Sequence, residues 1–170
     1  MTIRDLQDLL NYSHWANQKL FAKITILSPE QFTQPVAGSY GSIRNTLVHT
    51  LSAEWGWLDR CGGHPRGPAL VADNFPTLES LTTQWTQVQS WQKEFLAGLR
   101  DQDLGRVIEF SLGTGEKQRQ QMGDLLTHAI LHGVHHRGQV ALLLRQLGVA
   151  PENFDFLFYP AQRRPRVGTA

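Results

Sequence analysis

The sequence predicts an all-α protein whose architecture is a four-helix bundle with long connections, and three observations support this prediction. Four segments repeat apolar residues at intervals of three and four, the spacing that places them on one face of an α-helix. Glycine, proline and helix-capping residues punctuate the chain between these segments. A chain of 170 residues with 41% apolar and 18% charged residues is large and apolar enough to bury a core. We therefore expect a single domain over residues 1–170, with residues from about 160 to 170 forming a flexible tail.

The composition also limits the classes of partner. The formal net charge is +1, whereas proteins that bind nucleic acids or acidic membranes concentrate basic residues. The single cysteine, Cys61, rules out an intramolecular disulfide and a cysteine-based zinc knuckle. The amino-terminal residues lack the apolar region of a signal peptide, and no stretch approaches the roughly 20 apolar residues of a membrane span. We expect a cytoplasmic protein with no nucleic-acid partner and no membrane partner.

The first predicted helix covers residues from about 3 to 26. Thr2 is a suitable N-cap with Asp5 three residues on, and apolar side chains follow at helical spacing. Ser28 and Pro29 then favour one short extra turn.

The second and third long helices are predicted from about 42 to 60 and from about 77 to 99. The stretch CGGHPRGP, rich in helix-breaking residues, ends the second helix, and Pro76 precedes the third. These connections are long, so an alternating up-and-down order cannot be assumed.

A short β-hairpin and the last helix complete the prediction. Val107, Ile108 and Phe110, followed by a Gly-Thr-Gly centre, indicate the hairpin between the third and fourth helices. The fourth helix is expected from about 122 to 147, because Gly148 occupies the position that favours a left-handed helix end.

The stretch HAILHGVHHRGQV in this last helix contains four histidines in nine positions. Each residue advances about 100° around a helix, so His132 and His136 lie on one side, one turn apart. Leu125 lies within about 20° of His132, whereas Arg137 is expected to project away from that face. The histidine pair is therefore predicted to face the interior of the bundle.

A buried histidine pair needs partners. Burying a neutral imidazole without them costs about 1–3 kcal/mol, and protonation would place two like charges against an apolar interior. A divalent metal ion removes both difficulties by binding one nitrogen of each ring, and two ligands at i and i+4 are a recurring chelating arrangement. His128 cannot share an ion with His136, because eight residues separate them by about 12 Å along the axis.

The third ligand is expected from the second long helix, which carries His49. Its neighbours on the helical wheel are small or polar and leave space for an ion: Ser42, Asn45, Ala53 and Gly56. Leu47, Leu51 and Leu58 lie on roughly the opposite side. Either this helix is buried on two sides, for example through a dimer interface, or the wheel misjudges its inner face.

Spacing alone leaves two interpretations of His49, His132 and His136 open: metal ligands or hydrogen-bonded core histidines. We interpret His128 and His135 as surface groups or as groups that support the ligands. The remaining two histidines receive a structural interpretation, on a half-exposed helix face for His14 and in a loop for His64.

Four further side chains lie near the proposed site. Glu54 follows His49 by about 140° of rotation, which makes ligation by both strained and favours a surface or supporting role. Gln139 is placed to bond a water molecule or substrate, and Arg137 to form a salt bridge or interface contact. We treat Cys61 as incidental, because nothing in the sequence lowers the pKa of its thiol.

Four stretches resemble the DinB family. HGVHHRGQVALLLRQLG is similar to the last helix of that family, and LLNYSHWANQKL to its opening helix. SIRNTLVHTLSAEWGWL is similar to its second helix, which carries a lone histidine, and GVAPENFDFLFY to its closing segment. The four stretches occur together and in order across nearly the whole chain.

The resemblance implies a four-helix bundle in which His49, His132 and His136 surround a divalent ion, and it implies a homodimer. Relatives that use low-molecular-weight thiols imply a thiol-dependent transferase acting on a small molecule. Three imidazole ligands leave a coordination position open, which also allows hydrolysis by a metal-activated water. Imidazole suits zinc, nickel, copper or iron, and we expect zinc or nickel. The competing hypotheses are a non-catalytic metal-binding stress-response protein and a small-molecule binding module without turnover.

Overall fold

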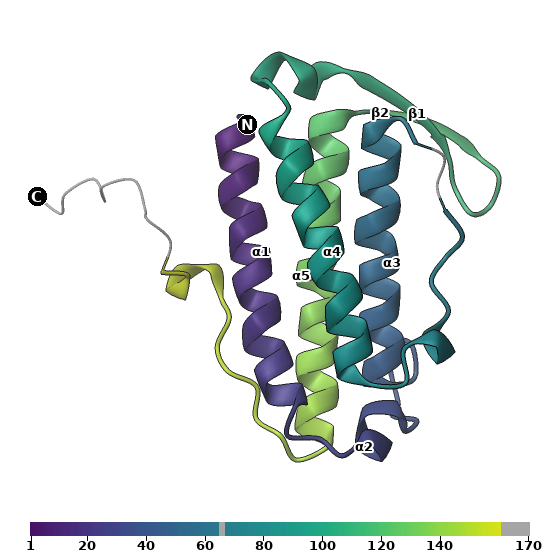
Figure 1. The fold of residues 1–170 in the computed structure, drawn as a ribbon, viewed down its shortest axis with the longest axis vertical. Coiled ribbons are helices and arrows are strands. Elements are labelled where there is room, and N and C mark those ends of the chain that lie inside the picture. The colour runs from purple at the N-terminus through teal and green to yellow at the C-terminus, as the bar shows by residue number, and fades with distance from the viewer. Residues whose placement is uncertain (65–66, 161–170) are drawn as a thin grey trace, which may run out of the picture.

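The computed structural model describes residues 1–64 and 67–160, and it confirms the predicted helical bundle (Figure 1). The long helices are α1 (Ile3–Ile24), α3 (Ile43–Gly62), α4 (Leu78–Ala97) and α5 (Met122–Gln146). Short elements occupy the connections: α2 (Pro29–Thr33) and the 3₁₀ turns η1 (Ala72–Asn74), η2 (Asp101–Gly105) and η3 (Phe156–Phe158). The tail expected from about residue 160 lies, from 161 onwards, outside the described residues.

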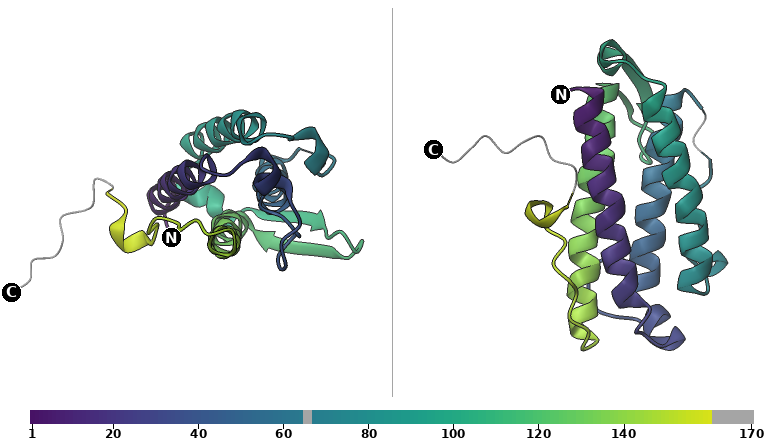
Figure 2. Two further views of the ribbon diagram at one scale, coloured as in Figure 1. Left: turned by 90° about the horizontal axis from the view of Figure 1, so that it is seen from below. Right: turned by 60° about the vertical axis from the view of Figure 1, so that its left-hand side comes forward.

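The long helices form a four-membered ring rather than an alternating up-and-down bundle. Figure 1 shows that α1 and α5 run in one direction, and that α3 and α4 run in the other. The end-on view in Figure 2 places α1 and α3 on opposite corners, and each of them packs against both α4 and α5. Because α3 and α4 are parallel, the chain returns along the bundle between them.

The predicted hairpin is present and lies across one end of the bundle (Figure 1). Strand β1 (Val107–Ser111) pairs antiparallel with β2 (Lys117–Gln121), and the register sets Val107 opposite Gln121 and Ser111 opposite Lys117. The second strand leads directly into α5, so the hairpin fixes where that helix starts.

The predicted caps account for the helix boundaries. The backbone N–H of Asp5 donates to the Thr2 hydroxyl at 3.2 Å, and the Asp5 carboxylate accepts from the Thr2 N–H at 2.9 Å. The Ser42 hydroxyl accepts from the Asn45 N–H at 3.0 Å at the start of α3. Gly148, with φ of 79°, follows the end of α5 in the left-handed conformation. Observed and predicted ends differ by one or two residues, the usual range at fraying helix termini.

The core consists of two apolar clusters separated by a polar layer at mid-length. One cluster lies towards α2 and is centred on Leu20, Leu47, Trp85 and Leu144. The other lies towards the hairpin and is centred on Leu6, Leu96, Met122 and Leu126. The polar layer between them consists of buried side chains from all four long helices: Ser13, His14, Asn17, Glu54, Gln92 and Arg137.

The structure changes three expectations for this layer. Arg137 does not project away from the bundle but is 2% exposed, and it donates to Ser13 Oγ at 2.8 Å and to Asn17 Oδ1 at 3.0 Å. His14 is buried rather than half-exposed, and its ring bonds Gln92 at 3.0 Å. Glu54 is buried, which excludes the surface role and leaves the supporting role among the two expected for it. A wheel that assigns one inner face by its apolar residues fails here, because each long helix packs against two neighbours and also buries polar residues at mid-length.

Packing against two neighbours also explains why α3, the second long helix, has candidate inner faces on opposite sides. Leu47 and Leu51 are buried in the core, while His49 is half-buried on the side of α3 that faces α5. The helix is therefore buried on two sides within one chain, by α4 and α5. Among the described residues, no helix combines the length and apolar character needed to cross a bilayer.

Candidate metal centre

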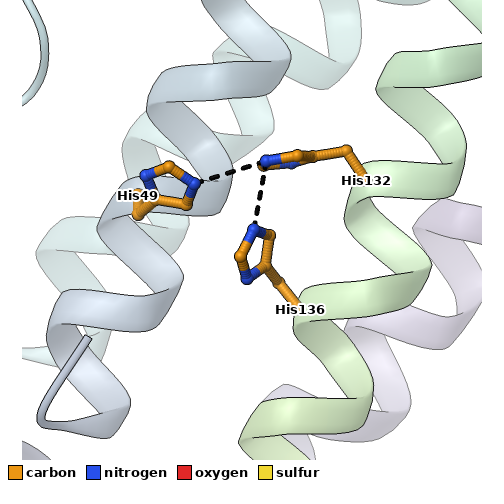
Figure 3. A group of neighbouring side chains, drawn as sticks. All are labelled: His49, His132 and His136. Atoms are coloured by element: carbon orange, nitrogen blue, oxygen red, sulfur yellow. Dashed lines mark hydrogen bonds between the residues drawn. The ribbon is translucent and has the colours of Figure 1, made fainter. Parts of the chain in front are cut away.

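The three predicted histidines converge between α3 and α5. Figure 3 shows His49 on α3 pointing towards His132 and His136, which lie one turn apart on α5. His132 Nε2 lies 3.3 Å from His49 Nε2 and 3.1 Å from His136 Nε2. One nitrogen from each ring lies within 4.8 Å of the other two, so the three residues could hold a metal ion.

These distances fit coordination of one ion. Nitrogens about 2.0–2.1 Å from a zinc ion lie roughly 3.3–3.4 Å apart when the geometry is tetrahedral. The two measured separations, 3.3 and 3.1 Å, are close to that edge length. The donor set of three imidazoles also suits divalent transition metals. The residues present therefore fit a divalent ion with at least one position left for a ligand from outside the chain.

Gln139 orients His136. Its side-chain oxygen accepts from His136 Nδ1 at 2.6 Å, which leaves the lone pair of Nε2 free to point at the other two histidines. The Ser39 hydroxyl donates to the same oxygen at 2.7 Å, and the Gln139 amide nitrogen lies 2.9 Å from His135 Nε2. Gln139 thus supports a candidate ligand, and its expected bond to a water molecule or substrate stays a prediction. The buried Nδ1 of His132 has no hydrogen-bond partner among the described residues.

Burial keeps His132 and His136 neutral. The pKa of His132 is lowered to about 4, chiefly by burial and in addition by the positive charges that His136 and His49 would carry. Burial also lowers the pKa of His136, whereas the hydrogen bond that it donates to Gln139 acts in the opposite direction. At neutral pH these rings therefore present lone pairs, the form in which histidine binds a metal.

Tyr40 is a functional candidate that the sequence interpretation missed. It lies in the loop before α3, and its hydroxyl oxygen is 2.9 Å from His49 Nε2. The two rings stack with centroids 4.0 Å apart. The available signal was a tyrosine between Gly38 and Gly41, in a loop that leads into the capped helix carrying His49.

The other candidates lie outside the convergent set. His128 is exposed and packs edge-on against Trp57, with ring centroids 5.0 Å apart. His135 is exposed and contacts Gln139, which fits the supporting role expected for it. Cys61 is buried in the last turn of α3, and burial raises the pKa of its thiol to about 11, so it remains incidental to the site.

Glu54 belongs to the polar layer rather than to the histidine group. Its carboxyl accepts from Trp85 Nε1 at 3.1 Å and from Gln92 Nε2 at 3.5 Å. Burial raises the pKa of this carboxyl to about 7, although the Arg137 guanidinium acts in the opposite direction.

Two known proteins are similar to this chain over most of its length. The chain is 24% identical over 161 residues to Protein DinB of Bacillus subtilis, an alignment that covers 89% of this chain and 91% of that protein. It is 21% identical over 155 residues to the protein YizA of the same organism, covering 89% and 94% of the two chains.

Two solved structures share the fold. A DinB-like protein from Bacillus cereus superposes with a TM-score of 0.71 at 21% identity, covering 89% of this chain and 97% of that one. A DinB family member from Shewanella denitrificans superposes with a TM-score of 0.62 at 17% identity, covering 96% and 93%. The DinB family profile matches residues 2–167, nearly the whole length, and the chain therefore belongs to the DinB family.

Proposed function

We propose that this DinB protein is a divalent-metal-dependent enzyme that acts on a small molecule, with His49, His132 and His136 as the metal ligands. The observation that carries the proposal is the convergence of three imidazole nitrogens from two helices at distances of 3.3 and 3.1 Å. Hydrogen-bonded core histidines, the other interpretation that the sequence leaves open, do not require three such nitrogens to gather at one point.

An open coordination position favours catalysis over a purely structural ion. Structural zinc sites are normally closed by four protein ligands from cysteine and histidine, whereas this site gathers three histidines. A pocket of about 330 Å³ lies beside the site and is lined by His49, Tyr40, Asn45, Ser52 and Leu70 among others. This volume falls at the lower end of the range for small-molecule pockets.

The proposed reaction is transfer of a thiol, or hydrolysis by an activated water. A bound divalent ion supplies Lewis acidity and favours the deprotonated form of a thiol or water molecule. The chain's own residues supply the geometry. Gln139 holds the His136 ring so that Nε2 faces the site, and α3 and α5 hold the ligands at their observed spacing. Zinc and nickel are the ions we propose.

Elemental analysis of untagged protein tests the ligand assignment. We expect about one divalent ion per chain in the wild type, loss of the ion in His132→Ala, and retention in His128→Ala. The last variant is the matched control, because His128 lies one turn away on the same helix and outside the convergent group. Stoichiometric metal in purified His132→Ala would show that the assignment is wrong.

A separate assay tests the reaction. Metal-loaded and metal-depleted protein are compared for conjugation of 1-chloro-2,4-dinitrobenzene with glutathione, bacillithiol and mycothiol, and for hydrolysis of ester substrates. A rate that needs both the metal and His132 supports the enzyme. A tightly bound ion without a metal-dependent rate in any of these assays would favour the non-catalytic metal-binding protein.

A further inference from the structure

Tyr40 stands beside the histidine nitrogen that would bind the metal. Its ring lies over the His49 ring, with centroids 4.0 Å apart and an interplanar angle of 19°. Its hydroxyl oxygen reaches to 2.9 Å from His49 Nε2. The Tyr40 ring also lies 5.7 Å from the ring of His136. The hydroxyl is therefore close to the atoms that converge, although no sequence motif assigns it a role.

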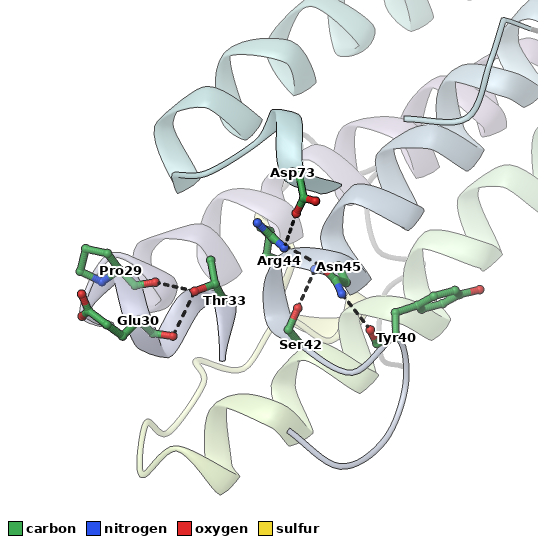
Figure 4. A network of polar contacts seen from close by, with 8 residues as sticks. All are labelled: Pro29, Glu30, Thr33, Tyr40, Ser42, Arg44, Asn45 and Asp73. Carbon is green, nitrogen blue, oxygen red and sulfur yellow. Dashed lines mark hydrogen bonds and ion pairs between the residues drawn. The ribbon is translucent and has the colours of Figure 1, made fainter. Parts of the chain in front are cut away.

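The loop that carries Tyr40 is held in place by hydrogen bonds to both α3 and α5. Ser39 has φ of 49°, a left-handed conformation unusual for a residue other than glycine, and its hydroxyl donates to Gln139 on α5. Asn45 Nδ2 donates to the Tyr40 carbonyl at 3.2 Å, as Figure 4 shows, and Thr46 donates to Ser39 Oγ at 3.1 Å. Gln139 thus bonds both His136 and the Tyr40 loop, so one residue links the tyrosine to a candidate ligand.

The stacking geometry indicates what the hydroxyl does. An imidazole lone pair lies in the plane of the ring, whereas Tyr40 stacks over that plane, so its ring would leave the His49 lone pair accessible to an ion. With a metal on His49 Nε2, the Tyr40 hydroxyl would be available to donate to another acceptor. A substrate atom bound to the same metal would be such an acceptor.

We propose that Tyr40 contacts the substrate, and that its hydroxyl donates a hydrogen bond to the substrate atom that occupies the open position of the metal centre. This inference rests on the proposed function, because it requires an ion at the three histidines. It also deepens that function, since Tyr40 and His49 line the same pocket of about 330 Å³. Among the described residues, this pocket is lined by Tyr40, His49 and short polar or apolar side chains, which fit a small, uncharged substrate body.

Cobalt-loaded protein provides the test, because ligands added to Co(II) change its visible absorption. Azide and 2-mercaptoethanol are titrated as probes into wild type, Tyr40→Phe and the control Tyr159→Phe, which removes a hydroxyl from the distant closing segment. Tyr40→Phe keeps the aromatic ring and removes only the hydroxyl. We expect it to bind Co(II) within about threefold of wild type and to bind both probes about tenfold more weakly, the effect of one lost hydrogen bond. Tyr159→Phe should match wild type in both measurements.

Three results would overturn the proposal: unchanged probe affinity in Tyr40→Phe, a loss of Co(II) affinity as large as in His49→Ala, or wild-type protein that binds neither probe. The second result would make Tyr40 a metal ligand instead. Failure of the metal assignment itself has a different signature, because His132→Ala would then retain Co(II).

Discussion

Replacing Glu54 by glutamine should make the protein more stable at pH 8 and leave its stability nearly unchanged at pH 5. Glu54 is 5% exposed, and burial raises the pKa of its carboxyl from 4.5 to about 7. Glutamine has almost the same shape, and its oxygen can still accept from Trp85 Nε1 and Gln92 Nε2. It differs from glutamate in being unable to ionise.

The size of the effect follows from the pKa shift. In the unfolded chain the carboxyl ionises near pH 4.5, whereas in the folded protein it retains its proton to about pH 7. Between these values the folded state binds more protons, so the free energy of unfolding falls as the pH rises. A shift from 4.5 to about 7 corresponds to roughly 3 kcal/mol, of which about 2–3 kcal/mol is lost between pH 5 and pH 8. Because glutamine does not ionise, Glu54→Gln should not lose this stability between pH 5 and pH 8.

Urea unfolding followed by circular dichroism, on metal-depleted protein at several pH values, measures this difference. Comparison with wild type is needed because the pKa values of His14 and His132 are lowered from 6.5 to about 4, so their contributions to stability rise with pH between these values. Both histidines are present in wild type and in Glu54→Gln, so their contributions cancel in the difference between the two proteins. Glu109→Gln, at a side chain that is 72% exposed, is the matched control and should show no comparable pH-dependent gain.

A difference that does not vary with pH would refute this reasoning. So would a wild type that is the more stable protein at pH 8, since that would mean that Arg137 more than compensates for the burial of the ionised Glu54 carboxylate.

The other predictions concern residues of α3 and α5. Gly133→Ala should destabilise the protein by about 1–3 kcal/mol, because the added carbon would lie 3.1 Å from Arg137 Nη1 and 3.2 Å from Glu54 Oε1. Gly138→Ala, five residues on in the same helix and facing open space, should instead stabilise it by about 0.5–1 kcal/mol, and urea unfolding distinguishes the two signs. Cys61, which is buried and has a pKa raised to about 11, should react with a thiol reagent such as DTNB at pH 8 only after unfolding. Fast labelling of the native protein would contradict its burial.

Local signals were sufficient for the helices and the hairpin. Capping residues such as Thr2 and Ser42 and the glycine at 148 act within one turn, so their effects are visible in a short stretch of sequence. The hairpin followed from a β-rich run beside a glycine-rich turn. The pair His132 and His136 on α5 could be predicted for the same reason, because residues four apart lie on one face of a helix.

The polar layer could not be predicted in this way, because its pairs join residues far apart in the chain. Arg137 meets Ser13 and Asn17 across more than a hundred residues, and Glu54 meets Trp85 and Gln92 on another helix. A helical wheel identifies an inner face by its apolar residues, so it assigns buried polar faces to solvent. Tyr40 was missed for a related reason: its contact with His49 depends on the left-handed turn at Ser39, which periodicity does not reveal.

The polar layer and the histidine group both restrict how α3 and α5 can turn relative to each other. Arg137 follows His136 directly and is bonded to α1, while Glu54 lies on α3 beyond His49 and is bonded to α4. Turning α5 by one residue would swing its histidines by about 100° away from His49 and would also remove Arg137 from its acceptors. An apolar core of similar volume could tolerate such a shift, since apolar contacts are non-directional, whereas buried charged groups lose their partners when they move. The layer therefore opposes the rotations that would separate the three imidazoles, even though burying Glu54 lowers the stability of the fold above pH 5.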